Sequence, residues 1–135
     1  MNITVDGNKE LHDSCRKFPD GSPSYELANA ASIDLLKNYG IDNSKITISP
    51  DNVIYLSKAI IHFINQGFTE IHANCAYEKG WELKHASIFY NELKIIADYI
   101  INNDLWKTHY ISLFNLNDFI PLLETQNENW CGGNG

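Results

Sequence analysis

The hydrophobic and polar positions along this chain alternate between short apolar runs and longer segments with helical spacing. Short runs at residues 3–5, 45–48 and 68–73 are rich in the β-branched residues typical of strands. After each run, apolar residues recur every three or four positions, which predicts an amphipathic helix. The three helical stripes are Leu27, Ala31 and Leu35, then Val53, Leu56, Ile60, Phe63 and Ile64, and finally Phe89, Leu93, Ile96, Ala97 and Ile100. The order predicts an α/β fold of about three βα units with parallel strands, and residues 110–114 predict a fourth strand.

Capping residues set the expected limits of the first two helices. The Ser-Pro pairs at 22–23 and 49–50 each place an N-cap before a first-turn proline, which has no backbone N–H to leave unpaired. Gly40 and Gly67 follow the two stripes, as expected where a left-handed residue ends a helix. The polar stretch between Asp6-Gly7 and Ser22 is expected to be a long loop.

Composition restricts the classes of function. With 44% hydrophobic and 20% charged residues in 135, the chain is typical of one globular domain. Ten Lys and Arg against 17 Asp and Glu give a net charge of −7, which disfavours binding to nucleic acid. No apolar run approaches the roughly 20 residues of a membrane span, and no secretion signal is visible. Three widely spaced cysteines favour a reduced, cytoplasmic protein.

Both ends of the chain look cut. The first predicted strand begins almost at residue 1, and the chain stops just after Trp130 and Cys131. Three or four parallel strands cannot close a barrel, and open parallel sheets normally contain more strands. We therefore expect a fragment, the alternative being a small natural domain with a disordered tail.

The stretch from Asp6 to Ser22 is dense in ionisable groups and follows the end of a predicted strand, where parallel α/β folds bind ligands. The planar guanidinium of Arg16 could clamp a carboxylate, and His12 with Asp13 could handle protons. The structural alternative is that Asp13 and Arg16 form a local surface ion pair.

The other candidate residues are more scattered. In the predicted loop 74–81, Asn74 and Glu78 could bind polar groups of a ligand, whereas Cys75 is expected to be a small buried side chain. None of His62, His72, His85 and His109 has a partner at metal-ligand spacing, which disfavours a zinc site. The glycines after Cys131 would let backbone amides approach its sulfur, as around cluster thiolates.

Several of these segments together resemble one enzyme family. They are Ile3-Thr4-Val5-Asp6-Gly7, Lys9-Glu10-Leu11-His12-Asp13, Arg16, residues 18–21, residues 70–75, residues 78–81, the stretch from Phe89-Tyr90 to Ala97-Asp98-Tyr99, and Asn129-Trp130-Cys131-Gly132-Gly133. The resemblance is to radical S-adenosylmethionine (radical SAM) enzymes, in the branch of peptide maturases and anaerobic sulfatase maturases with a C-terminal SPASM-type domain. It spans nearly the whole chain.

The resemblance implies a fold, cofactors and a substrate. Residues 1–128 would be the C-terminal half of a partial (βα)6 TIM-like barrel, and residues 129–135 the start of the auxiliary-cluster segment. The parent would be an oxidoreductase in which a [4Fe-4S] cluster cleaves S-adenosylmethionine, and the resulting 5′-deoxyadenosyl radical attacks a peptide or protein substrate. By position, Thr4 and Arg16 would face S-adenosylmethionine, Asp6 would shape the strand end, and Cys131 would bind an auxiliary cluster.

The sequence departs from this family in two respects. Thr4 stands where the family usually has Ser, which keeps the hydroxyl but adds a methyl group. The Cys-x3-Cys-x2-Cys motif that holds the family's catalytic cluster is absent, since the cysteines stand at 15, 75 and 131. The isolated chain is therefore expected to be inactive and to bind neither cofactor stably. A half barrel would also leave unpaired strand edges and an apolar inner face, so we expect self-association. The competing hypothesis is a non-enzymatic α/β module that binds an anionic ligand or a partner through residues 6–22.

Overall fold

The computed structural model of the chain describes residues 4–77 and 80–113, and it is an α/β structure with a parallel sheet, as the sequence predicts. The strands are β1 (Asn43–Ile48), β2 (Glu70–Cys75) and β3 (Tyr110–Leu113). The helices are α1 (Lys9–Cys15), α2 (Tyr25–Tyr39), α3 (Leu56–Gln66) and α4 (Leu83–Asn102), with short 3-10 turns η1 (Val53–Tyr55) and η2 (Leu105–Lys107).

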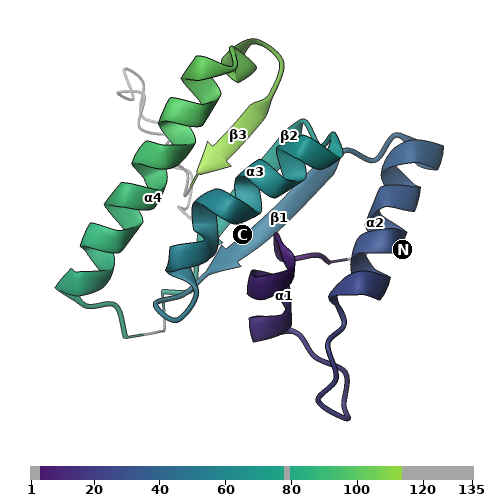
Figure 1. Cartoon of the computed structure of the whole chain (residues 1–135), viewed down its shortest axis with the longest axis horizontal. Coiled ribbons are helices and arrows are strands. Elements are labelled where there is room, and N and C mark those ends of the chain that lie inside the picture. The colour runs from purple at the N-terminus through teal and green to yellow at the C-terminus, as the bar shows by residue number, and fades with distance from the viewer. Residues whose placement is uncertain (1–3, 78–79, 114–135) are drawn as a thin grey trace, which may run out of the picture.

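The strands lie in the sheet in the order of the chain, β1-β2-β3, and both pairings are parallel (Figure 1). Consecutive helices are joined by hydrogen bonds. The Tyr25 hydroxyl of α2 bonds His62 of α3, and the Ser57 backbone N–H of α3 donates to Glu92 of α4 at 2.8 Å. Sequential strands with neighbouring helices form a singly wound layer, in contrast to folds that place helices on both faces of the sheet.

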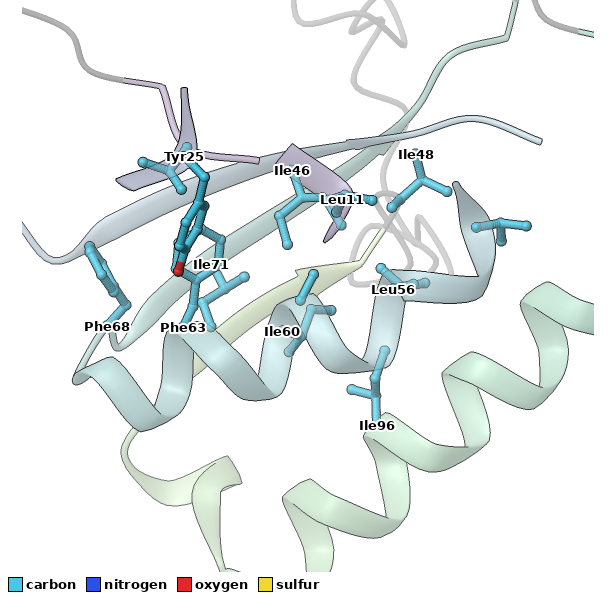
Figure 2. Close-up of a cluster of buried hydrophobic side chains, with 14 residues drawn as sticks. Leu11, Tyr25, Ile46, Ile48, Leu56, Ile60, Phe63, Phe68, Ile71 and Ile96 are labelled. Atoms are coloured by element: carbon cyan, nitrogen blue, oxygen red, sulfur yellow. The ribbon is translucent and has the colours of Figure 1, made fainter. Parts of the chain in front are cut away.

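The core lies between the sheet and α3. Alternate residues in the middle of β1 and β2 point toward the helix and are buried, while α3 contributes residues at helical spacing (Figure 2). The residues buried here are Ile46, Ile48, Ile71 and Ala73 from the strands, Val53, Leu56, Ala59, Ile60 and Phe63 from η1 and α3, Leu11 from α1 and Ile96 from α4. The stripe predicted from Val53 to Ile64 is confirmed, with Ile64 packed at its margin.

The expected first strand is not formed in the residues described. Thr4 and Val5 pair with no strand, although Val5 is buried. The stretch from Asp6 to Ser22, expected to be a loop, contains α1, whose N-cap Asn8 accepts a hydrogen bond from Leu11 N–H at 3.3 Å. This seven-residue helix buries only Leu11 and His12, too few positions to produce a visible helical stripe.

Helix α2 differs from its prediction at its start and in its buried face. It begins at Tyr25 after Ser24, and not at Pro23. Leu27, assigned to the buried stripe, is 67% exposed. The face that packs inward carries Tyr25, Ala28, Ile33 and Leu36, which also recur at helical spacing. Gly40 and Gly67 end α2 and α3 in the left-handed conformation, as predicted.

The strand limits shift slightly from those predicted. Strand β1 begins two residues earlier than predicted, at Asn43. The backbone N–H of Phe68 donates to Phe63 O at the end of α3, so β2 starts only at Glu70. The fourth predicted strand is β3, while the last predicted residue, Phe114, lies outside the described residues.

Gly7 sets how closely the N-terminal segment approaches α3. Its φ is +77°, and a Cβ built there would lie 2.4 Å from the Cβ of Ala59. Gly21 has a similar φ of +83° but no atom within 4 Å of such a Cβ. A Gly21→Ala substitution therefore introduces backbone strain without steric overlap, and it serves as the control for Gly7→Ala.

We expect Gly7→Ala to lower the free energy of unfolding by about 1–3 kcal/mol more than Gly21→Ala, because only the first adds overlap in the core. Urea denaturation of both variants measures the difference. Equal losses would contradict the close packing of Gly7 on Ala59.

Candidate functional site

A buried ion pair joins the N-terminal segment to the end of α1. Asp6 is 4% exposed, and its Oδ2 accepts a hydrogen bond from Arg16 Nε. A carboxylate removed from water needs such a partner. The Arg16 side chain is half exposed, so one face of the guanidinium stays open to solvent. The structure thus brings together two of the predicted site residues.

His12 is buried and fully hydrogen-bonded as a neutral ring. The backbone N–H of Asp6 donates to His12 Nδ1 at 3.1 Å, which leaves Nε2–H to donate to Ser24 Oγ at 3.0 Å. The Ser24 hydroxyl then donates to Arg16 O at 3.1 Å. Burial lowers the pKa of His12, because desolvation disfavours the charged ring.

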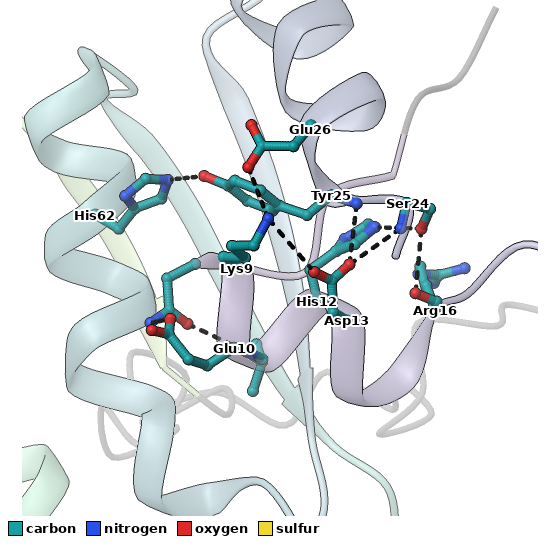
Figure 3. A network of polar contacts seen from close by, with 11 residues as sticks. Lys9, Glu10, His12, Asp13, Arg16, Ser24, Tyr25, Glu26 and His62 are labelled. Atoms are coloured by element: carbon teal, nitrogen blue, oxygen red, sulfur yellow. Dashed lines mark hydrogen bonds and ion pairs between the residues drawn. The ribbon is translucent and has the colours of Figure 1, made fainter. Parts of the chain in front are cut away.

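Asp13 caps helix α2 and does not pair with His12. One of its carboxylate oxygens accepts from the backbone N–H groups of Ser24 and Tyr25, at 3.1 and 3.0 Å (Figure 3). The predicted His12–Asp13 proton-handling pair is therefore wrong, and so is the alternative of a surface Asp13–Arg16 pair. His12 and Asp13 instead bind the backbone of two different segments, residue 6 and residues 24–25.

The network continues from α2 to α3. The Tyr25 hydroxyl lies 2.6 Å from His62 Nε2, and the Tyr25 ring makes an edge contact with His12 (Figure 3). Burial raises the pKa of Tyr25 and lowers that of His62, each in favour of the neutral form. His62 is thus a packing residue that links two helices.

Two open pockets meet at the Asp6–Arg16 pair. One, of about 510 Å³, lies at the carboxyl ends of β1 and β2, where parallel α/β folds place ligands. It is lined by Asp6, Ser14, Cys15, Arg16, Thr47, Ser49, Asp51, Asn52 and Ala76. The other, of about 530 Å³, runs along β1 and shares Asp6, Arg16 and Thr47 with the first.

The pocket along β1 reaches the sheet face opposite the buried residues, and this face is polar. It carries Asn43, Lys45 and Thr47 from β1, Glu70, His72 and Asn74 from β2, and Tyr110 and Ser112 from β3. The expectation of an apolar inner face is therefore wrong. Parallel strands are usually buried on both faces and apolar throughout. This sheet therefore differs from the usual parallel sheet in having one polar face.

The remaining predicted residues are placed as follows. Thr4 is exposed and lines the pocket along β1 together with Asp6 and Arg16. Cys131 and Glu78 lie outside the described residues. Asn74 belongs to β2 rather than to the loop after it.

The two described cysteines lie in different surroundings. Cys15 is exposed, and its sulfur accepts a hydrogen bond from Asn52 Nδ2 at 3.2 Å. Cys75 is half-buried, and burial raises the pKa of its thiol. Within residues 4–77 and 80–113, no three His, Cys, Asp or Glu side chains are grouped so as to hold a metal ion.

Lys45, Thr47 and His72 were not predicted as site residues. The evidence for them is the alternation of polar and apolar residues in 45–48 and 70–74. Alternation shows that one face is polar, but only the sheet register shows that Lys45 and His72 stand side by side.

Comparison with protein-family profiles and with curated proteins finds no match for this chain. Among the helices in the described part of the chain, none is both long and apolar enough to cross a membrane.

The buried neutral His12 makes stability depend on pH. Its pKa is 6.5 when unfolded and lower when folded, so the unfolded chain binds more protons as pH falls. The contribution of neutral His12 to the free energy of unfolding is therefore fully present above pH 6.5 and is lost as the pH falls below it. We expect the free energy of unfolding, measured by urea denaturation from pH 7.5 to 5, to fall less steeply in His12→Gln than in the parent. His85→Gln on α4 is the control, and an unchanged slope in His12→Gln would contradict the assignment.

The Asp6–Arg16 pair is tested by a double-mutant cycle. Arg16→Gln leaves a buried carboxylate without its cation, so we expect a loss of roughly 1–3 kcal/mol in the free energy of unfolding. In Asp6→Asn combined with Arg16→Gln, no charge is buried, and we expect a loss smaller than the sum of the two single losses. Additive single losses, measured by urea denaturation, would show that the two side chains are not coupled.

Proposed function

We propose that this chain is part of the barrel of a radical SAM enzyme that modifies a peptide or protein, and that it supplies one wall of the ligand cavity. The strands follow one another in chain order, with helices α3 and α4 packed beside each other. This arrangement is compatible with a segment of a singly wound βα barrel, which supports the proposal. In such a segment the polar sheet face would point to the interior.

The observation that carries the proposal is the Asp6–Arg16 pair at the junction of the two pockets. Nε of Arg16 is held by Asp6, which orients the guanidinium and leaves its terminal nitrogens for a ligand. Thr4 presents a hydroxyl in the same pocket. A half-exposed guanidinium beside a hydroxyl fits the carboxylate of S-adenosylmethionine.

In the proposed enzyme, Asp6 would hold Arg16 in place, and Arg16 and Thr4 would bind and orient the amino-acid end of S-adenosylmethionine. S-adenosylmethionine would supply the 5′-deoxyadenosyl radical that attacks the peptide. The described residues do not fit a [4Fe-4S] cluster, because no three possible ligands are grouped among them. We therefore assign them binding and positioning, and no part in electron transfer. The isolated chain is proposed to be inactive.

The alternative is a non-enzymatic module that binds an anion through residues 6–22. In this stretch, Lys9 lies 2.7 Å from Glu26, which largely offsets its charge. Arg16 would therefore be the main group for the anion, as it is for the carboxylate of S-adenosylmethionine in the proposed enzyme. Lys17 is the remaining cation of that stretch, and one exposed lysine provides little specificity.

Arg16→Lys tests the proposal, because it keeps the charge beside Asp6 but removes the planar fork. We expect calorimetry to show weak binding of S-adenosylmethionine to the full chain, reduced about tenfold further by Arg16→Lys. Lys17→Gln, at the next position in the chain, is the control and should bind S-adenosylmethionine as tightly as the unsubstituted chain does. Thermal unfolding checks that Arg16→Lys is folded. No binding of S-adenosylmethionine by the unsubstituted chain, or equal binding by Arg16→Lys, would reject the proposal.

A further inference from the structure

The middle of the polar sheet face contains a cation and a histidine in neighbouring positions. Lys45 on β1 is the register partner of His72 on β2, and His72 is in turn the partner of Ser112 on β3. Paired residues of adjacent strands point to the same side of the sheet, so Lys45 and His72 share this face. Both line the pocket of about 530 Å³ along β1, together with Thr47.

The carboxylates of this pocket are already engaged. Glu70 Oε1 lies 2.8 Å from His72 Nε2, and Asp6 is paired with Arg16. Lys45 is left with a neutral partner. The hydrogen-bonding pattern orients the Asn74 amide so that its oxygen accepts from Lys45 Nζ at 3.3 Å and its nitrogen donates to Ala73 O at 3.2 Å.

The arrangement around His72 leaves one ring nitrogen for a ligand. Its Nε2 faces Glu70, and its ring packs against Tyr110 with centroids 5.7 Å apart. These contacts fix the ring, and the structure gives no hydrogen bond to Nδ1 from the described residues. Because the Glu70 carboxylate only accepts, Nε2 of His72 donates to it, and Nδ1 is the acceptor nitrogen of the ring. A ligand above the sheet would therefore meet two donors, the Lys45 ammonium and the Thr47 hydroxyl, and one acceptor, Nδ1 of His72.

We propose that Lys45, with the Thr47 hydroxyl beside it, binds a carboxylate of the peptide substrate, while Nδ1 of His72 accepts a hydrogen bond from a peptide N–H. A single ammonium with the Glu70 carboxylate nearby matches one negative charge, which favours a carboxylate over a phosphate dianion. That the carboxylate belongs to a peptide rests on the proposed function. The site would select substrates with an acidic side chain or a free C-terminus.

The experiment uses the full chain and two blocked peptides, acetyl-Gly-Glu-Gly-amide and its Gln counterpart. They differ only in the charged group. In titrations followed by NMR, we expect the Glu peptide to bind roughly fivefold more tightly than the Gln peptide and to shift the resonances of Lys45 and His72. Lys45→Gln should abolish this preference. Because Lys45 is exposed, the substitution leaves the core intact.

Lys58→Gln is the matched control, because it removes the same charge from an exposed position on α3, behind the sheet. It should keep the preference for Glu. Equal binding of the two peptides, or an equal effect of Lys58→Gln, would overturn the proposal.

A third titration adds S-adenosylmethionine, because its carboxylate could also be the group that binds at Lys45. Displacement of the Glu peptide from Lys45 by this cofactor would assign the site to the cofactor and overturn the peptide assignment. The peptide titration contains no cofactor, so its outcome is independent of the Arg16 test. A Glu preference without any binding of S-adenosylmethionine would support the carboxylate site while rejecting the proposed enzyme.

Discussion

The arrangement of the N-terminal half depends on the burial of Asp6. Its carboxylate is taken out of water and requires Arg16, while its backbone N–H requires the Nδ1 of His12. The two contacts of Asp6, with Arg16 and with His12, hold α1 to the segment that precedes it. Once α1 is placed, Asp13 reaches the first backbone N–H groups of α2, and Ser24 closes the chain of hydrogen bonds onto Arg16 O. One buried charge thus positions two helices and the guanidinium proposed to bind a ligand.

A second constraint is the difference in polarity between the two faces of the sheet. The face toward α3 is filled by isoleucine and alanine side chains, whereas the opposite face carries charged and amide groups. A packed barrel interior would require bulky apolar residues on that face. The polar residues instead suit a cavity that admits water or a ligand. The two proposals use different parts of this cavity, since Arg16 ends α1 beside the carboxyl edge of the sheet and Lys45 lies midway along β1.

The parts of the fold that could be predicted are those with many residues repeating one pattern. In α3, five apolar positions share one face, and Gly67 ends the helix in a conformation that glycine adopts without strain. Strands β1 and β2 were predicted from β-branched residues, with errors of about two residues. Helix α1 was missed because seven residues hold too little periodicity, and Leu27 was misplaced because α2 offers two overlapping helical stripes.

The sequence by itself determined the α/β class and the parallel order of the strands, because these follow from local patterns of apolar residues. Only the tertiary structure decided what the charged side chains do. Asp6 and Arg16 are ten positions apart and meet through a turn and a helix, while His12 and Asp13 are adjacent yet bind different segments. Lys45 and His72 become neighbours through strand register, which depends on how α3 packs across the sheet. Long-range contacts of this kind arise from packing, which no local pattern in the chain records.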